Sequence, residues 1–387
     1  MTSPASILIA SFSGRALATS ARRAGLRPLV VDAFGDVDTR QVADKIRVLP
    51  GAFQHGFRAK TLLPALRDLT EEATSSLVGL VLGSGFEDKP RLIATLAKNF
   101  KLLGCSSDTV RACKNPFHLH DALTKHQIPT PPVANAPPNG STRRWLRKHI
   151  GATGGGHISD AATADPSHPN TYVQGYIQGR SISALCLANG AQGRCDVIGF
   201  SEQWCTPTEH QTFRFGGGVG PIELSDDMSD AISRNAEKLS LEFQLQGLVA
   251  LDYIATEDQT AHLIEVNPRP SATLDLFETN TGDLLTAHIR TCQGASTHTL
   301  VPSKTNTSRA SSYLYADHGP VSIKDLSWPA WCCDRPSVGT KIPRQGPIAT
   351  ITAQADAPKA AKKLCQTRLG ELCDMIYNKE KTEAQPE

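Results

Sequence analysis

Two acidic residues and an asparagine lie on neighbouring apolar runs between residues 247 and 269. The segment indicates two strands joined by the four polar residues 257–260. Counted outward from that loop, Asp252 lies directly opposite Glu265. Because side chains alternate between the two faces of a strand, Asn267 shares the face of Glu265. The hairpin therefore brings two carboxylates and an amide together.

Carboxylates at directly opposed strand positions have Cβ atoms only ~5 Å apart and repel each other unless a cation lies between them. The same count pairs Thr256 with Ala261 beside the loop. A few oxygen ligands suit Mg²⁺, which keeps water and substrate phosphates as its other ligands. Arg269 adds a positive charge close by. The alternative is a solvent-facing hairpin, but apolar neighbours such as Leu251 and Tyr253 predict burial, where unpaired carboxylates are costly.

The segment resembles the metal-binding signature of the ATP-grasp superfamily of carboxylate–amine and carboxylate–thiol ligases. In that family an acidic residue, a later Glu and an Asn two positions further bind the Mg²⁺ that bridges the ATP phosphates. Asp252, Glu265 and Asn267 match in type, order and approximate spacing, and Pro268-Arg269 completes a form seen in many members. The resemblance implies ATP and Mg²⁺, or Mn²⁺ in its place, as cofactors.

Two lysines match those with which the family holds ATP phosphates. Lys114 precedes the family-like stretch 126–131, although Cys113 stands where Asp is often found. Lys148 precedes a glycine run that resembles the family's flap. Independently of the resemblance, glycines let backbone N–H groups approach a phosphate closely. The alternatives are a solvated lysine and a flexible loop. The flap glycines predicted to bind ATP are Gly154, Gly155 and Gly156.

Residues 173–179 resemble the hinge that holds adenine in this family. By that resemblance, the carbonyl of Gln174 and the N–H of Ile177 pair with adenine, and Tyr176 belongs to the same site. Arg180 stands where many members have an acidic residue. It is assigned either to the nucleotide site or to a substrate carboxylate.

A second glycine run, residues 216–218, follows Arg214. We interpret it as a loop that faces the acceptor substrate, with Arg214 as a clamp. A plain glycine-rich turn is the alternative. Arg214 joins Lys148 and Arg269 as the residues to which we assign catalytic roles.

Composition narrows the class of protein. The chain has 387 residues, enough for two to three domains at ~150 residues each. Its 40 basic and 38 acidic residues give a formal net charge of +2, so no strong field draws it to nucleic acid. No apolar run approaches the ~20 residues that span a bilayer. The ten cysteines form no Cys-x-x-Cys pair, which favours reduced thiols in a cytoplasmic protein.

The order of elements predicts an α/β fold. Strands alternate with helices in the first third, which is typical of βαβ units around a parallel sheet. A dinucleotide fingerprint is excluded there, because Gly14 stands alone at the first turn. With the resemblance, we expect a Rossmann-like domain over residues 1–110 and an ATP-grasp domain of α+β type over 111–295. We place a small lid at about 130–172 and a biotin-carboxylase-like α+β segment, with a frayed tail, at 296–387.

The resemblance implies an ATP-dependent ligase that activates a carboxylate as an acyl phosphate and joins it to an amine. The biotin-carboxylase-related subgroup that it most resembles suggests glutamate joined to tyrosine or tyramine, in the biosynthesis of a methanofuran-type one-carbon carrier. The alternatives are an enzyme that phosphorylates bicarbonate and a non-catalytic nucleotide-binding module. The expected partners are therefore a small carboxylate and an amine, with a homodimer left open.

Overall fold

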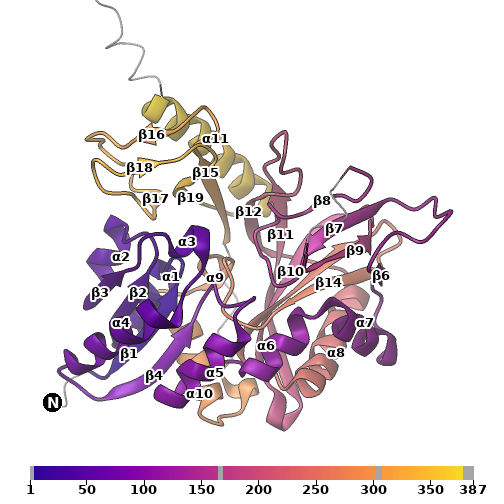
Figure 1. Ribbon diagram of the computed structural model, residues 1–387, viewed down its shortest axis with the longest axis horizontal. Coiled ribbons are helices and arrows are strands. Elements are labelled where there is room, and N and C mark those ends of the chain that lie inside the picture. The colour runs from indigo at the N-terminus through magenta and orange to yellow at the C-terminus, as the bar shows by residue number, and fades with distance from the viewer. Residues whose placement is uncertain (1–3, 164–168, 301–306, 378–387) are drawn as a thin grey trace, which may run out of the picture.

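A five-stranded parallel sheet forms the N-terminal part of the protein. The computed structural model describes residues 4–163, 169–300 and 307–377. The strand order is β3-β2-β1-β4-β5, and all neighbours run parallel, as predicted (Figure 1). Its strands are β1 (Ser6–Ser11), β2 (Arg27–Asp32), β3 (Lys45–Val48), β4 (Leu77–Leu82) and β5 (Leu102–Leu103). Its helices are α1 (Arg15–Arg23), α2 (Val37–Val42), α3 (Ala52–His55), α4 (Ala59–Glu71) and α5 (Pro90–Asn99).

The strand order reverses between β1 and β4. Strands β2 and β3 lie on one side of β1, and β4 and β5, which follow α4, lie on the other side. The segments that follow these two strands therefore meet at the carboxyl edge of the sheet, where open α/β sheets bind their ligands. The N–H of Phe12 donates to the carbonyl of Ser84 at 3.0 Å and ties the two segments together. Glu87 follows β4 at this edge.

A small four-stranded sheet with the order β6-β9-β7-β8 follows helices α6 (Ser107–Lys114) and α7 (Pro116–Lys125). Its strands are β6 (Val133–Ala134), β7 (Trp145–His149), β8 (Ser159–Asp160) and β9 (Thr171–Gly175). All four strands are short, and the connection between β7 and β8 carries the glycine run. The sheet spans residues 133–175, and we had placed a small lid at about 130–172.

An antiparallel sheet of eight strands makes up the rest of the protein, in the order β14-β13-β10-β11-β12-β15-β19-β17. Its strands are β10 (Arg180–Asn189), β11 (Arg194–Cys205), β12 (Phe215–Ile222), β13 (Gln246–Ala255), β14 (Ala261–Asn267), β15 (Ser308–Tyr315), β17 (Cys332–Cys333) and β19 (Pro347–Ala355). The helices of this part are α8 (Asp226–Phe243), α9 (Leu274–Phe277), α10 (Asp283–Cys292) and α11 (Pro358–Tyr377). Two short strands, β16 (Val321–Ser322) and β18 (Lys341–Ile342), pair with each other.

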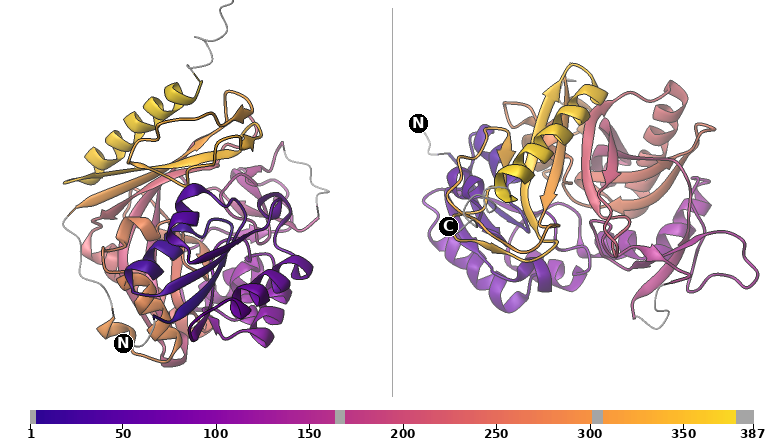
Figure 2. Two further views of the ribbon diagram at one scale, coloured as in Figure 1. Left: turned by 90° about the vertical axis from the view of Figure 1, so that its left-hand side faces the viewer. Right: turned by 90° about the horizontal axis from the view of Figure 1, so that it is seen from above.

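We call this eight-stranded sheet the grasp sheet. Its last three strands come from the segment after residue 296, so the C-terminal part extends the sheet at one edge. Strand β15 pairs with β12, and α11 covers β15 and β19. The same segment also reaches the N-terminal sheet, because Arg335 binds Asp38. In Figure 2 it lies, in yellow, across both parts.

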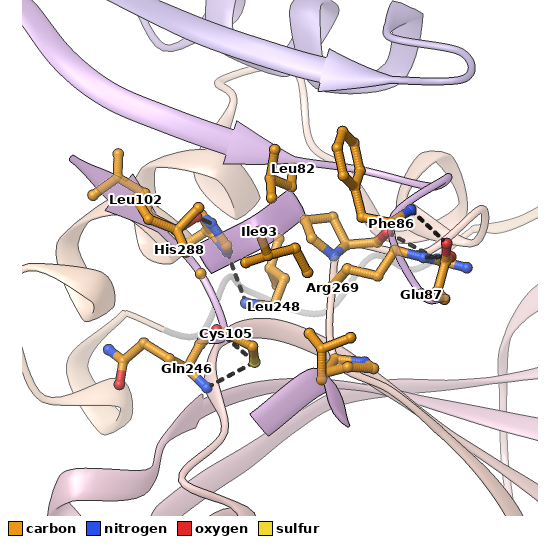
Figure 3. A pocket seen from close by; sticks show the side chains of 16 residues that line it. Leu82, Phe86, Glu87, Ile93, Leu102, Cys105, Gln246, Leu248, Arg269 and His288 are labelled. Atoms are coloured by element: carbon orange, nitrogen blue, oxygen red, sulfur yellow. Dashed lines mark hydrogen bonds and ion pairs between the residues drawn. The ribbon is translucent and has the colours of Figure 1, made fainter. Parts of the chain in front are cut away.

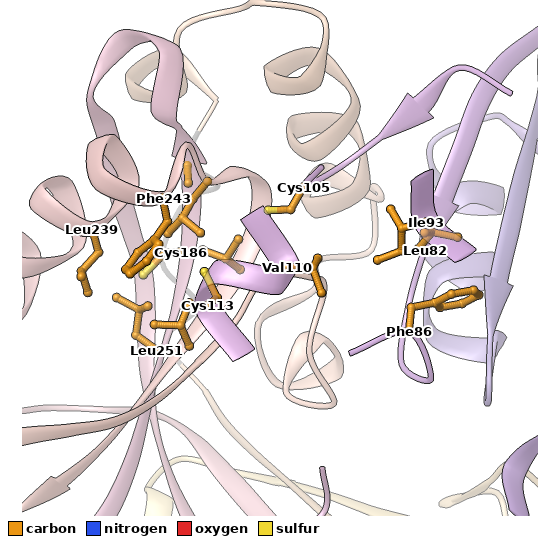
Figure 4. Packing of buried hydrophobic residues seen from close by; sticks show 14 of the residues in the cluster. Leu82, Phe86, Ile93, Cys105, Val110, Cys113, Cys186, Leu239, Phe243 and Leu251 are labelled. Carbon is orange, nitrogen blue, oxygen red and sulfur yellow. The ribbon is translucent and has the colours of Figure 1, made fainter. Parts of the chain in front are cut away.

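The two faces of the grasp sheet differ in character because side chains alternate along each strand. On one face Leu251 packs with Cys186 and with Leu239 and Phe243 of α8 (Figure 4). Between Leu251 and Tyr253, which are both fully buried, Asp252 projects to the opposite face. The apolar positions thus fix the direction in which the carboxylate points.

The structure corrects two sequence-based expectations. Beside the loop of the hairpin, Ala255 pairs with Ala261, whereas we expected Thr256 in that place. A register shift next to Asp252 then restores the predicted pairing of Asp252 with Glu265. Residues 216–218 do not form a loop: they lie within β12. A side chain at Gly217 would come within 2.5 Å of the Trp204 ring, so glycine lets the ring cover the strand.

All ten cysteines lie within the described residues and are free thiols. No helix in the described ranges is long and apolar enough to cross a membrane. The tail after residue 377, which we expected to be frayed, lies outside the described residues.

Candidate active site

Strands β13 and β14 bring the three predicted metal ligands together. Asp252 and Glu265 are directly paired residues, and the Asn267 side-chain amide donates to Oδ2 of Asp252 at 2.8 Å. Lys114, the last residue of α6, donates from Nζ to Oε1 of Glu265 at 2.6 Å and to Oδ1 of Asn267 at 2.8 Å. Lys114, which we expected to bind the ATP phosphates, thus forms hydrogen bonds with two of the three predicted metal ligands.

Burial dominates the electrostatics of this group. Burial raises the pKa of Asp252 to about 6, and the nearby charge of Glu265 acts in the same direction. Burial alone would raise the pKa of Glu265 as well, but the ammonium group of Lys114 holds it below its usual value. Burial therefore disfavours the ionised form of Asp252, whereas Lys114 favours the ionised form of Glu265.

The residues present fit a divalent cation. Oδ1 of Asp252 is buried, and no residue in the described ranges gives it hydrogen-bond geometry. Ser183 is paired with Asp252 across β10 and β13, and its hydroxyl is likewise buried without a hydrogen-bond partner among the described residues. Its proximity lowers the pKa of Asp252, against the larger effects of burial and Glu265. A buried carboxylate oxygen with no strong donor is a suitable ligand for Mg²⁺. The described residues contain no cluster of three His, Cys, Asp or Glu, so the asparagine is needed to complete the set.

Arg269 lies beside the hairpin and is held by a buried carboxylate. Its Nε donates to Oε1 of Glu87, and the two side chains are 15 % and 5 % exposed. The other oxygen of Glu87 accepts the N–H groups of Gly85 and Phe86 at 2.8 and 2.9 Å. Burial alone would raise the pKa of Glu87, but Arg269 and Lys114 lower it, so it stays ionised. Figure 3 shows Glu87 and Arg269 pointing toward each other.

A cavity of about 20 Å³ lies next to this pair, among the side chains drawn in Figure 3. It holds about one water molecule and is too small for a nucleotide. His288 lines it and joins two parts of the protein: its Nδ1 accepts from the N–H of Leu248, and its Nε2 contacts the carbonyl of Leu103 at 3.1 Å. Burial lowers the pKa of His288 to about 4, which keeps it neutral. The cavity is therefore part of the packing beneath Arg269.

Lys148 and the glycine run occupy the lid. Nζ of Lys148 donates to the side-chain oxygen of Gln174 at 2.6 Å, and burial lowers the pKa of this lysine. The charges of Glu265 and Asp252 act on the pKa of Lys148 in the opposite direction and raise it. The sequence analysis used only the backbone carbonyl of Gln174; its side chain is an additional contact.

The glycine run is docked onto the start of β12. The carbonyl of Gly154 accepts the N–H of Phe215 at 2.9 Å. At Gly155, where φ is +72°, a Cβ atom would lie 1.9 Å from the carbonyl oxygen of Phe213. At Gly156, a Cβ atom would lie 3.4 Å from the side chain of Gln211. The flap is therefore closed in this structure, and glycine permits the contact.

The predicted adenine hinge connects the lid to β10. The N–H of Tyr176 donates to the carbonyl of Arg144 at 2.8 Å, and the Arg144 guanidinium lies 4.7 Å from the centre of the Tyr176 ring. Ile177 follows, half-buried, in the connection. Arg180 is 57 % exposed and lies 3.8 Å from Glu202, so the structure does not bring it together with the carboxylates of the hairpin.

Arg214 is bound to the C-terminal segment. Its two terminal nitrogens donate to the two carboxylate oxygens of Asp317 at 2.9 and 2.7 Å, and its Nε donates to the carbonyl of Thr206 at 3.1 Å. Its guanidinium lies 3.9 Å from the centre of the Tyr315 ring. None of these contacts, among the residues described, involves the hairpin.

Glu87 and Ser183 were not predicted as site residues. Glu87 follows β4 at the carboxyl edge of the sheet, but its partner Arg269 lies 182 residues away in the sequence. Ser183 had no signal, because only the pairing of β10 with β13 sets it opposite Asp252.

A model of a known sequence family matches the middle of the chain. Residues 113–273 match the sequence model of a family described as the ATP-grasp domain, and this range contains Lys114, Lys148, the flap and the hairpin. A search of curated proteins found no match. Residues 113–273 therefore form an ATP-grasp domain.

Solved structures share the fold over nearly the whole chain. The biotin carboxylase domain of 2-oxoglutarate carboxylase from Hydrogenobacter thermophilus, with MgADP and bicarbonate, is 14 % identical with a TM-score of 0.69, covering 94 % of this chain and 88 % of that one. The L-amino acid ligase from Bacillus licheniformis is 14 % identical with a TM-score of 0.66, covering 97 % and 98 %. N5-carboxyaminoimidazole ribonucleotide synthetase from Thermotoga maritima is 14 % identical with a TM-score of 0.65, covering 95 % and 98 %. The ATP-grasp match agrees with ATP and Mg²⁺ as cofactors, and the Hydrogenobacter structure contains MgADP.

Proposed function

We propose that this ligase phosphorylates a small carboxylate with ATP and joins the resulting acyl phosphate to an amine. The observation that carries the proposal is the convergence of Lys114, Lys148 and Arg269 on the paired carboxylates Asp252 and Glu265. Three cations around one metal-binding group suit the transfer of a highly charged phosphoryl group, since catalysis there is mainly positioning and neutralisation of charge.

The bonds change in two steps. A carboxylate oxygen attacks the γ-phosphorus and the bond to ADP breaks. The amine nitrogen then attacks the acyl carbon, the bond to phosphate breaks, and the nitrogen loses a proton to solvent. Bound Mg²⁺ would neutralise the phosphate oxygens. Asp252, Glu265 and Asn267 would hold it, and Arg269 would stabilise the developing negative charge.

The closed flap supports this sequence, because an acyl phosphate is hydrolysed when water reaches it. Gln174, Ile177 and Tyr176 are the residues that we propose for adenine, and the N–H groups of the flap are those proposed for phosphate. Arg180 stays a proposal as a substrate contact.

For the substrates, we propose glutamate as the acid and tyrosine or tyramine as the amine, in the biosynthesis of a methanofuran-type carrier. The support is the resemblance stated above. A second candidate is the phosphorylation of bicarbonate, which is favoured by the bicarbonate in the Hydrogenobacter structure. We further propose a cytoplasmic protein, given its free thiols, that forms a homodimer and accepts Mn²⁺ in place of Mg²⁺.

The test is ADP release from the purified protein with MgATP, over a grid of acids and amines. The grid includes glutamate, other amino acids and bicarbonate, combined with tyrosine, tyramine and amino acids. Glu265→Ala is the control, because it removes one ligand without touching the flap. ADP formed only with a particular acid–amine pair, and lost in the variant, is the expected result. ADP formed with bicarbonate alone favours the second candidate. ATP that binds tightly without any turnover across the grid would contradict both.

A further inference from the structure

The segment on which the flap closes is built jointly by the grasp sheet and the C-terminal part. We define the flap-docking segment as residues 211–215. Its Phe215 N–H binds the carbonyl of Gly154, and its Phe213 carbonyl faces Gly155 directly. The ring centres of Phe213 and Tyr176 lie 6.5 Å apart, so the segment also adjoins the proposed adenine hinge.

Arg214, in the middle of this segment, is the residue through which it is held. Its guanidinium forms a two-point ion pair with Asp317, and its side chain is only 5 % exposed. Its backbone carbonyl accepts the N–H of Thr206 at 2.8 Å, and its Nε returns a bond to the carbonyl of Thr206. The planar fork of arginine fixes direction as well as charge.

A second contact from the C-terminal part fixes the neighbouring residue. The hydroxyl of Tyr315 donates to the carbonyl of Phe215 at 2.8 Å, while its ring lies against Arg214. The N–H of Asp317 donates to the Tyr315 carbonyl at 2.8 Å, and β15 is paired with β19 on its far side. Three side-chain bonds from residues after 296 therefore reach the segment that receives the flap.

We propose that Asp317 and Arg214 are positioning residues for flap closure, so that the C-terminal part determines how well the site excludes water. This inference rests on the proposed function for its kinetic consequence, but its structural part does not. Arg214, which we expected to clamp the acceptor, acts in this proposal on the backbone of Phe213 and Phe215. Without the Asp317 carboxylate, the docking segment would lose the contact that holds it against the flap.

The test compares Asp317→Asn with Asp38→Asn. Both variants remove a carboxylate that pairs with an arginine and connects the C-terminal part to another part of the protein. Asp317 connects it to the flap-docking segment, whereas Asp38, in α2, connects it through Arg335 to the N-terminal part. Hydrogen–deuterium exchange of the peptide that contains the Phe215 amide reports the flap bond itself. We expect exchange there to rise roughly tenfold in Asp317→Asn and to stay at the wild-type rate in Asp38→Asn. Arg214→Lys, which keeps the charge but loses the fork, should be intermediate.

The kinetic readout is the amount of amide formed per ADP. Leakage of water should lower this ratio to half or less in Asp317→Asn and raise ADP formation without amine by roughly tenfold. A merely structural role would lower both products together and leave the ratio unchanged. Equal exchange and equal ratios in the two variants would overturn the proposal. If no acid–amine pair gives ADP in the wild type, the proposed function fails, and the exchange measurement still decides the role of Asp317.

Discussion

A single methyl group at Gly155 should hold the flap open. Gly154 and Gly155 have nearly the same φ, +76° and +72°, and both lie in the region that disfavours other residues. A Cβ at Gly154 meets nothing within 4 Å, whereas one at Gly155 would lie 1.9 Å from the Phe213 carbonyl oxygen. The pair of alanine variants therefore separates the contact from the strain of the backbone.

The size of the effect follows from this difference. An alanine in the left-handed region costs about 1–2 kcal/mol at either position, so that cost cancels in the comparison. Only the methyl at Gly155 also forces the flap away by more than ~1 Å, which breaks the bond from Phe215 to Gly154, worth about 1 kcal/mol, and its packing. We expect closure to be weakened by a further 2–3 kcal/mol, which is roughly a 30- to 150-fold lower rate.

The assay is the rate of amide and ADP formation in Gly155→Ala and Gly154→Ala at saturating MgATP. Thermal unfolding of both variants serves as the control, and we expect equal midpoints because the flap lies at the surface. Equal rates in the two variants would refute the reasoning, since the contact with Phe213 would then contribute nothing to closure.

Three further perturbations probe the groups around the hairpin. Glu87→Gln should lower the free energy of unfolding by about 3 kcal/mol, because it leaves Arg269 buried without a counter-charge. Glu72→Gln, in a pair whose side chains are 33 % and 38 % exposed, should lower the denaturant midpoint much less. Lys148→Met should lower ADP formation by ~10²-fold while the denaturant midpoint stays or rises, since a buried ammonium is removed; turnover within threefold of wild type would contradict its role. His288 has a pKa of about 4 in the folded protein and ~6.5 unfolded, so the unfolded chain binds its proton first as the pH falls. Stability should therefore drop by up to roughly 3 kcal/mol between pH 6.5 and 4, and His288→Gln should show a shallower slope in denaturant titrations; an unchanged slope would exclude His288 as the cause.

The hairpin was predictable because its signals are local. Alternation of apolar residues and the Asn267-Pro268-Arg269 ending set the face and the end of β14 without any tertiary information. The register beside the loop was not predictable, because a single bulge next to Asp252 shifts the pairing by one residue and leaves no mark in residue type. The central pairing with Glu265 was nevertheless correct.

Contacts between segments that are far apart in the chain could not be predicted from the sequence. The residue type of Arg214 does not tell whether it binds a substrate or Asp317, because Asp317 lies 103 residues away in the sequence. Likewise, a run of three glycines is typical of a loop, and the strand there is formed by its pairing with β11 and β15. The partner of a charged residue is decided by sheet order, which local patterns do not specify.

The shared sheet has a consequence for how this protein can be divided. Because β15 pairs with β12, a chain cut after residue 295 would leave β12 as an unpaired edge, with its N–H and C=O groups open to other chains. Such a fragment would aggregate although it contains the whole matched domain. A fragment for expression should therefore keep the grasp sheet together with its C-terminal strands.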